Sequence, residues 1–143
     1  MKVGLIGAGL QARRRARTLN GAELAMIAAA NWDEAKLLAD EVGCEATANW
    51  EEVVERADVE VVIVCTPPHL HAPISIAAMR AGKHVLCEKP LARVPEEAEE
   101  IVDVARETKM KLKCGFNLRH HRAIRQAREW LEQGAIGDLG FIR

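Results

Sequence analysis

Aromatic residues are scarce in this sequence, and their scarcity limits how a core can be built. They make up 3% of the 143 residues, and tyrosine is absent. Because 49% of the residues are nevertheless hydrophobic, the core must consist mainly of Ala, Val, Leu and Ile. A chain of this length is typical of one domain and buries about two-thirds of its unfolded surface.

The sequence also lacks an excess of charge of one sign. Charged residues make up 29% of the chain, yet the formal net charge is only -1. Binding driven by the charge of a nucleic acid or an anionic membrane needs a clear basic excess. The composition therefore predicts neither kind of partner.

Long apolar runs and paired cysteines are missing as well. No run approaches the ~20 apolar residues that cross a bilayer. The stretch 3–10 is apolar, but arginines at 13–15 follow it where a secretory signal needs small residues. The four cysteines are Cys44, Cys65, Cys87 and Cys114. Without a C-x-x-C pair they favour reduced thiols over a zinc site or a disulfide framework. We therefore expect a cytoplasmic protein without a bound metal.

The N-terminal stretch carries the first motif. An apolar run at 3–6 leads into Gly7-Ala8-Gly9, and a segment that favours a helix follows. This order matches the dinucleotide fingerprint G-x-G-x-x-G/A, although glycines alone also fit a flexible turn. Gly7 would allow the sharp turn, and Gly9 would let a pyrophosphate approach the backbone at the positive end of the helix. The residues expected to bind the cofactor here are Gly7, Gly9, Leu10, Gln11 and Ala12.

Arginines crowd the start of this helix. Ala12, Ala16 and Leu19 share one face, while Arg15 flanks that face. The other arginines are Arg13, Arg14 and Arg17. Cations in a first helical turn oppose the helix dipole, so the cluster fits either an anion such as a cofactor phosphate or a solvated arginine face.

Apolar runs typical of strands alternate with segments of helical periodicity along the whole chain. The predicted strands are residues 3–6, 24–30, 46–48, 59–65, 84–87 and 111–114. Predicted helices follow the glycine turn, begin at Asp33 as an N-cap residue, and then include 50–56, 74–81, 95–108 and 122–133. The alternation indicates an α/β protein with a Rossmann-type, doubly wound parallel sheet in three α/β/α layers.

Ligands of such sheets bind outside the carboxyl ends of the strands. The unusual residue clusters of this chain fall at those ends: 7–9, 31, 65–68, 87–90 and 114–117. Their coincidence predicts a cofactor cleft at this edge.

Three stretches together resemble one family. They are the glycine turn at 7–12, the block from Thr66-Pro67-Pro68-His69 through Gly82-Lys83-His84-Val85 to Glu88-Lys89-Pro90, and Gly115-Phe116-Asn117. They are similar to the N-terminal half of the glucose–fructose oxidoreductase / inositol dehydrogenase family, Gfo/Idh/MocA. The resemblance runs from Lys2 to the last residue. It implies an NAD(P)-dependent dehydrogenase or reductase of sugars, cyclitols or related polyols.

Family members carry a Rossmann domain followed by a larger sheet-based substrate domain. The resemblance therefore implies a Rossmann domain at 1–134. Residues 135–143 would begin a second α+β domain that is truncated or absent, with Ile142 and Arg143 inside its first strand. A polyol or sugar would then be a substrate only if that second domain is supplied. We expect the chain alone to bind cofactor without efficient turnover.

The resemblance also implies individual roles. Lys89 is expected to be catalytic, beside the nicotinamide and the reacting oxygen of the substrate. The remaining expected cofactor residues are Asn31, Trp32, Thr66, Pro67, His71, Glu88 and Asn117. From the residues alone, a lysine between Glu88 and Pro90 at the end of a buried strand can donate a hydrogen bond to a hydroxyl or help take up its proton. The alternative is a surface lysine paired with Glu88.

The sequence indicates the choice between NAD and NADP less clearly. An acidic residue usually ends the second strand in the family and binds the ribose hydroxyls, but Asn31 stands here. With Arg13 and Arg14 nearby, both NAD and NADP fit, and NAD is favoured.

Two other functions compete with an oxidoreductase, and the second of them fits poorly. One is a non-catalytic nucleotide-binding module that forms a homo-oligomer through an apolar tail at 136–142. The other, an S-adenosylmethionine-binding Rossmann domain, does not call for Lys89.

Overall fold

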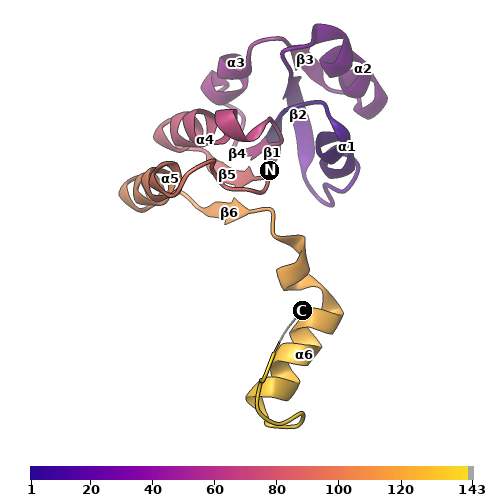
Figure 1. The fold of residues 1–143 in the computed structure, drawn as a ribbon. Coiled ribbons are helices and arrows are strands. Elements are labelled where there is room, and N and C mark those ends of the chain that lie inside the picture. The colour runs from indigo at the N-terminus through magenta and orange to yellow at the C-terminus, as the bar shows by residue number, and fades with distance from the viewer. Residues whose placement is uncertain (142–143) are drawn as a thin grey trace.

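Six strands form one parallel sheet in the order β3-β2-β1-β4-β5-β6 (Figure 1). The strands are β1 (Lys2–Ile6), β2 (Glu23–Ala28), β3 (Glu45–Thr47), β4 (Val61–Val64), β5 (His84–Cys87) and β6 (Leu112–Cys114). The order reverses between β1 and β4, which is the switch point of a doubly wound sheet. The computed structural model describes residues 1–141. The strand of a second domain expected at Ile142 and Arg143 lies outside these residues.

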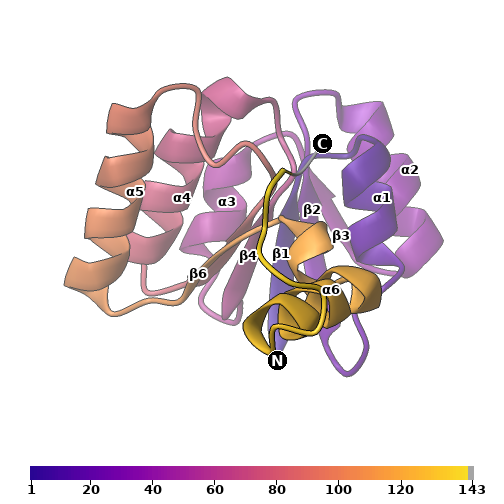
Figure 2. The same cartoon turned by 60° about the horizontal axis from the view of Figure 1, so that its bottom comes forward.

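Helices cover the sheet on both faces, as Figures 1 and 2 show. The helices are α1 (Leu10–Ala16), α2 (Trp32–Val42), α3 (Trp50–Glu55), α4 (His71–Arg80), α5 (Pro95–Thr108) and α6 (Arg122–Glu132), with 3₁₀ turns η1 (Pro68–Leu70) and η2 (Asn117–His120). The helices α1 and α2 close one apolar core over β1 and β2. The helices α3, α4 and α5 close the other core on the opposite face. The predicted three-layer Rossmann architecture is therefore confirmed.

The start of α2 differs from its prediction. Asp33 was expected to cap this helix, but that prediction was wrong, because Asn31 is the cap residue. Its Oδ1 accepts hydrogen bonds from the backbone N–H of Asp33 (3.0 Å) and of Glu34 (3.4 Å). An amide oxygen caps a helix as well as a carboxylate does. The helix thus begins earlier, and Trp32 is its first residue.

Two glycines of β1 and its turn allow close packing between layers. A Cβ on Gly4 would collide with Cγ1 of Val53 on α3. Gly7 has a φ of +115°, and a Cβ there would lie 2.5 Å from the carbonyl oxygen of Cys65. Only glycine fits such a backbone. The first turn therefore lies directly against the end of β4.

The first residues of the stretch 82–90, which belongs to the block that resembles the family, hold loops of the fold together. Lys83 is 8% exposed, and its Nζ donates to the carbonyl oxygens of Arg56 (2.8 Å) and Val59 (2.7 Å). The Nδ1 of His84 accepts from the backbone N–H of Lys111 (3.1 Å). These bonds join the loops at the amino ends of β4, β5 and β6, at the opposite edge of the sheet from the predicted cofactor cleft.

One part of the sheet has less cover. On β5 and β6, Val85 and Cys87 are buried in the core under α4 and α5. On the other face His84 and Leu86 are only half-buried, and Lys113 is exposed. The helices α1 and α2 therefore cover the part of this face that β1 to β4 form, where Ile63 of β4 is buried, and leave β5 and β6 less covered.

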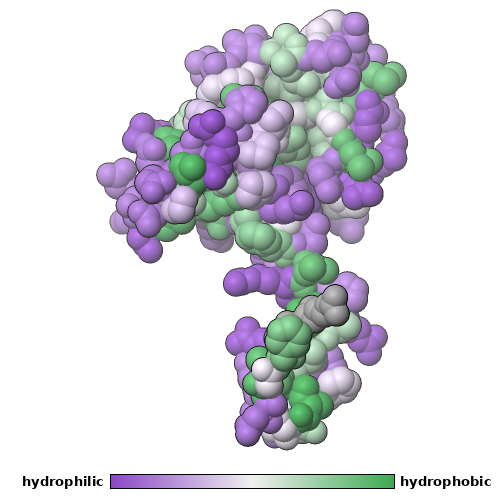
Figure 3. Space-filling model, viewed as in Figure 1, coloured by the Kyte–Doolittle hydropathy of each residue, from purple (hydrophilic) through white to green (hydrophobic). Residues whose placement is uncertain are grey.

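The helix α6 projects away from the sheet (Figure 1). None of its residues is buried. Apolar surface shows on this lobe (Figure 3). The exposed large apolar side chains of α6 and the residues after it are Ile124, Trp130, Ile136, Leu139 and Phe141. Within residues 1–141, no helix is both long and apolar enough to cross a membrane.

Candidate functional site

A cleft of about 500 Å³ lies at the carboxyl ends of the strands, beside the switch point between β1 and β4. Its walls come from the glycine turn after β1, the residues after β2, β3 and β4, and the start of α4. The lining residues are Ile6, Gly7, Ala8, Gly9, Ala29, Ala30, Asn31, Glu34, Ala48, Trp50, Cys65, Thr66, Pro67, Leu70 and Ile74. Of the predicted site residues, this set contains Gly7, Gly9, Asn31, Thr66 and Pro67.

The middle of the cleft suits a dinucleotide. A Cβ on Gly9 would meet no atom within 4 Å, so the bare backbone there faces open space. Across the cleft, the Oγ1 of Thr66 is buried without a hydrogen-bond partner among residues 1–141. A buried hydroxyl without a partner is costly, and a polar ligand would satisfy it. Exposed backbone, an unpaired hydroxyl and apolar walls fit a phosphate-linked nucleotide.

Three predicted cofactor residues at the start of α1 lie in different environments. Leu10 is 65% exposed at its start, while Gln11 is half-buried. Ala12 is fully buried in the core beneath α1. Ala12 therefore packs the helix onto the sheet, as its small size predicts, and does not line the cleft.

At the other end of the cleft, Asn31 is joined by two residues that the sequence reasoning missed. Glu34 and Trp50 both line the cleft, whereas Trp32 is 47% exposed and lies outside the lining. Glu34 stands one helical turn beyond Asn31, so helical spacing from a correctly placed cap would have found it. Trp50 follows β3, the one strand whose carboxyl end was left out of the predicted site.

Three side chains form an ion-pair cluster near the catalytic candidate. Arg15 donates from Nε (2.9 Å) and Nη2 (2.6 Å) to Oε1 of Glu88, and from Nη2 (3.1 Å) to Oδ1 of Asn117. The side chain of Glu88 is 6% exposed. A Cβ on Gly115 would lie 2.6 Å from its Oε2. We call Arg15, Glu88 and Asn117 the carboxylate cluster.

Lys89 follows directly on this cluster but takes no part in it. It is exposed, its peptide bond to Pro90 is cis, and it makes no hydrogen bond or ion pair with any residue from 1 to 141. The alternative in which Lys89 pairs with Glu88 is therefore wrong, because Glu88 binds Arg15 instead. Arg15 likewise directs its guanidinium to a carboxylate within the protein.

His71 was expected to line the cleft, but it lies behind the wall. It is 1% exposed, its Nδ1 is 2.7 Å from the carbonyl oxygen of Pro90, and its Nε2 is 2.8 Å from that of Thr66. Its ring thus joins the loop after β4 to the loop after β5. His71 supports the residues on either side of it and does not face the cleft.

Thiols at the strand ends are poor nucleophiles. Burial raises the pKa of Cys65 to about 12 and that of Cys87 to about 12. The negative charge of Glu88 adds to the rise at both thiols. Thiols that stay protonated at neutral pH are inert. We therefore assign these cysteines to packing. Between residues 1 and 141, no cluster of three or more His, Cys, Asp or Glu residues could hold a metal ion.

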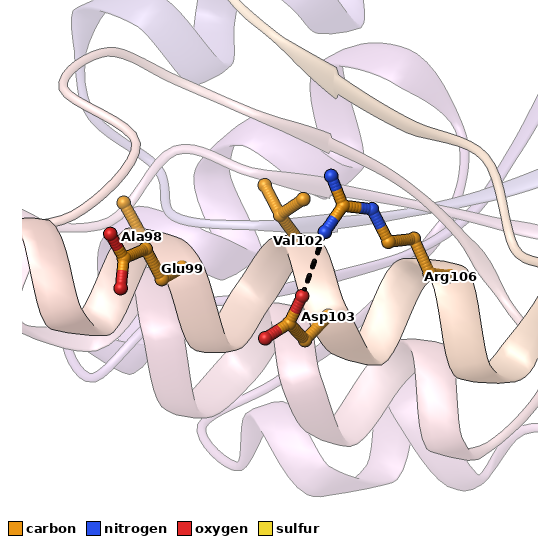
Figure 4. A pocket seen from close by; sticks show the side chains of 5 residues that line it. All are labelled: Ala98, Glu99, Val102, Asp103 and Arg106. Atoms are coloured by element: carbon orange, nitrogen blue, oxygen red, sulfur yellow. Dashed lines mark hydrogen bonds and ion pairs between the residues drawn. The ribbon is translucent and has the colours of Figure 1, made fainter.

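A second depression lies along the outer face of α5, away from the cleft. Figure 4 shows its lining, all from this one helix. Arg106 donates to Asp103 at 2.9 Å, so these two charged groups are already paired within the helix. With no polar groups converging from other elements, this depression offers no recognisable site.

Residues 1–116 match the family described as "Oxidoreductase family, NAD-binding Rossmann fold", which is Gfo/Idh/MocA. The chain belongs to this family. The resemblance drawn from the three sequence stretches is thereby confirmed.

Relatives named for their activity match nearly the whole length of the chain. Levoglucosan dehydrogenase of Pseudarthrobacter phenanthrenivorans is 38% identical over 157 residues, which cover 100% of this chain and 40% of that protein. The solved scyllo-inositol dehydrogenase of Lactobacillus casei, with bound NAD(H) and scyllo-inositol, has a TM-score of 0.90 at 28% identity, over 96% of this chain and 42% of that one. A 3-ketoreductase of Actinomadura kijaniata, solved with TDP-benzene and NADP, has a TM-score of 0.88 at 38% identity, over 96% and 45%. The chain thus spans less than half the length of these relatives.

Proposed function

We propose that this chain binds a nicotinamide dinucleotide in the cleft at the strand ends and is the cofactor half of an oxidoreductase of sugars, cyclitols or related polyols. The observation that carries the proposal is the position of the cleft. It runs from the bare backbone at Gly9 along the carboxyl ends of the strands, and Lys89 follows the end of β5 at the same edge. We further propose that residues 1–134 form the cofactor domain and that 135–143 lead into a substrate domain.

The proposed binding mode follows the order of the residues in the cleft. The backbone around Gly7 and Gly9, with the first residues of α1, would hold the pyrophosphate. Asn31 and the nearby Trp32 would mark the adenosine end. Thr66 and Pro67 would form the opposite wall, with the hydroxyl of Thr66 as a free hydrogen-bond donor and acceptor. His71 would hold this wall in place from behind.

The proposed chemistry centres on Lys89. A bound nicotinamide would supply the hydride donor or acceptor. Lys89 would donate a hydrogen bond from its ammonium to the reacting oxygen of the substrate and help to take up or return that proton. Glu88 and Asn117 would fix the protein around the nicotinamide end. A second domain is needed to hold the polyol and to exclude water.

We propose that NAD binds at least as well as NADP. The first-turn amides of Asp33 and Glu34 already donate to Asn31, so they are not free to bind a 2′-phosphate. The carboxylate of Glu34 lines this end of the cleft. It can accept hydrogen bonds from ribose hydroxyls and repels a phosphate.

Titration of the purified chain with NADH and with NADPH tests the proposal, with tryptophan fluorescence as the readout because Trp50 lines the cleft. We expect saturable binding of both, with NADH at least as tight. Glu34→Gln should tighten NADPH by about fivefold, close to 1 kcal/mol. Asp33→Asn is the matched control, because Asp33 stands in the same helical turn but outside the cleft lining.

If neither NADH nor NADPH binds, the proposed function is disproved. The preference for NAD fails if NADPH binds more than about tenfold tighter, 1.4 kcal/mol, and Arg13→Ala or Arg14→Ala removes the difference. In that case the arginines, rather than Glu34 and Asn31, determine the choice.

A second candidate function is an assembly module that binds nucleotide without catalysis. The exposed apolar side chains of α6 and the following residues favour it, because surfaces of this kind mark interaction sites. We propose that the chain by itself forms a homo-oligomer through this lobe. The four free cysteines fit a reducing, cytoplasmic location.

A further inference from the structure

The carboxylate cluster brings together parts of the chain that lie far apart in sequence. Arg15 stands on the helix after the glycine turn, Glu88 follows β5, and Asn117 begins η2. Arg15 and Glu88 are 73 residues apart, and Arg15 and Asn117 are 102 apart. The cluster therefore links α1, the helix after the glycine turn, to the loop that carries Lys89.

Glu88 is held in place from two sides. Two nitrogens of Arg15 reach the same carboxylate oxygen, Oε1, at 2.9 and 2.6 Å. The other oxygen lies against Gly115, where even a single added carbon would be only 2.6 Å away. A nearly buried carboxylate is stable only when it is paired in this way. Arg15 thus determines where the charge of Glu88 lies.

The neighbouring Lys89 is the obvious competitor for that charge. Lysine has a long flexible stem and can fold back onto an adjacent carboxylate. In the structure Glu88 points inward to Arg15, while Lys89 is exposed and unpaired with respect to residues 1–141. The cluster accounts for one positive and one negative charge, so among residues 1–141 the adjacent ammonium of Lys89 is left without an ion-pair partner.

We propose that Arg15 is a positioning residue: by binding Glu88 it keeps the ammonium of Lys89 free for the oxygen of a substrate. The proposal rests on the proposed function, because a free ammonium matters only if Lys89 acts on a substrate. It also gives Arg15 a role other than binding the cofactor phosphate. Loss of the guanidinium would leave Glu88 without its partner, and Lys89 would become its nearest free cation in sequence.

Amine labelling of the full chain without cofactor tests this. The chain is treated at neutral pH with a limiting amount of acetic anhydride, and acetylation of Lys89 is measured by mass spectrometry relative to Lys36 and Lys113. We expect Arg15→Gln to slow the labelling of Lys89 by roughly threefold, the effect of an exposed ion pair. Adding Glu88→Gln in the same chain should restore the rate, because no carboxylate is left to bind the lysine.

Arg17→Gln is the matched control. Arg17 follows α1 directly and pairs with Glu41 at 2.6 Å, so its loss removes an ion pair that does not involve Glu88. The rate at Lys89 should not change in this variant. If Arg15→Gln alone does not fold, as circular dichroism would show, the comparison of Glu88→Gln with the double variant decides, and the two should label Lys89 equally.

Three results would overturn the proposal: an unchanged rate in folded Arg15→Gln, a slowed rate that Glu88→Gln does not restore, or a double variant that labels Lys89 more slowly than Glu88→Gln alone. These outcomes are independent of the nucleotide titrations, because the labelling is done without cofactor. Failure of nucleotide binding would disprove the proposed function and leave the labelling result unaffected.

Discussion

At the scale of single residues, the two glycines of the first turn differ in what requires them. Gly7 is required by the fold, since its φ is +115° and a Cβ would lie 2.5 Å from the carbonyl oxygen of Cys65. Gly9 has an ordinary φ, and a Cβ there would meet nothing within 4 Å. Any need for glycine at position 9 must therefore come from a ligand.

Gly9→Val should consequently weaken nucleotide binding without weakening the fold. A branched side chain would fill the space where the pyrophosphate must approach, and we expect a loss of about tenfold or more in affinity, at least 1.4 kcal/mol. The free energy of unfolding should stay close to that of the wild type, as measured by urea denaturation. Gly7→Ala provides the contrast and should destabilise the fold by about 1–3 kcal/mol. An unchanged dissociation constant for Gly9→Val would remove the phosphate-binding interpretation of this turn.

Backbone positions at the strand ends follow more directly from the sequence than the directions of side chains do. Gly9 and Thr66 lie in the cleft because the carboxyl ends of parallel strands must meet at one edge. Glu34 and Arg15 were not assigned to the site, because the direction of a helical side chain depends on where the helix begins and how it packs. The error at the cap of α2 shows this: with Asp33 as the cap, Glu34 does not appear one turn beyond the strand end.

At the scale of elements, hydrophobic patterns, together with prolines and glycines that begin or end elements, predicted most of the sheet. The helix at 95–108 has the predicted bounds, because proline marks its start and its apolar positions follow one face. The helix after the glycine turn ends at Ala16, short of Leu19. The long block at 82–90 reads as one motif, yet its first half fastens the amino ends of strands and its second half lies near the cleft. A single sequence cannot separate these two uses.

The bridge made by His71 leads to a prediction about the elements that it joins. His71→Leu keeps an apolar body of similar size but removes the ring between the carbonyl groups of Thr66 and Pro90. The carbonyl oxygen that accepts the ring N–H would then lose its partner. Because a buried polar group that loses its hydrogen bond costs about 1–3 kcal/mol, we expect the free energy of unfolding to fall by that amount in urea denaturation. Nucleotide affinity should also fall, since the loop at Thr66 forms one wall of the cleft. Unchanged stability and affinity would mean that the two loops are held by other contacts.

At the scale of the whole molecule, residues 1–141 leave two surfaces largely uncovered. One is the face of β5 and β6 on which Leu86 is half-buried and Lys113 exposed. The other is the projecting lobe formed by α6 and the residues after it (Figures 1 and 3). The relatives described above are more than twice as long as this chain. An added substrate domain would account for both surfaces, and self-association of the isolated chain would be another way to bury them.

We therefore predict that the isolated chain binds cofactor, does not turn over polyols at a useful rate, and self-associates. Hydride transfer needs a substrate held in reach of the nicotinamide with an acid–base group on its oxygen, and Lys89 alone cannot hold a sugar. Exposed apolar side chains at Ile136, Leu139 and Phe141 favour burial against a second copy. Sedimentation of the full chain should reveal a dimer or larger oligomer, whereas a chain ending at Gly134 should shift toward monomer. Monomers in both cases would disprove assembly through the tail. Production of NADH from inositol or glucose by the full chain, at rates typical of a dehydrogenase, would disprove the predicted lack of turnover and would mean that residues 1–143 suffice to hold a substrate beside Lys89.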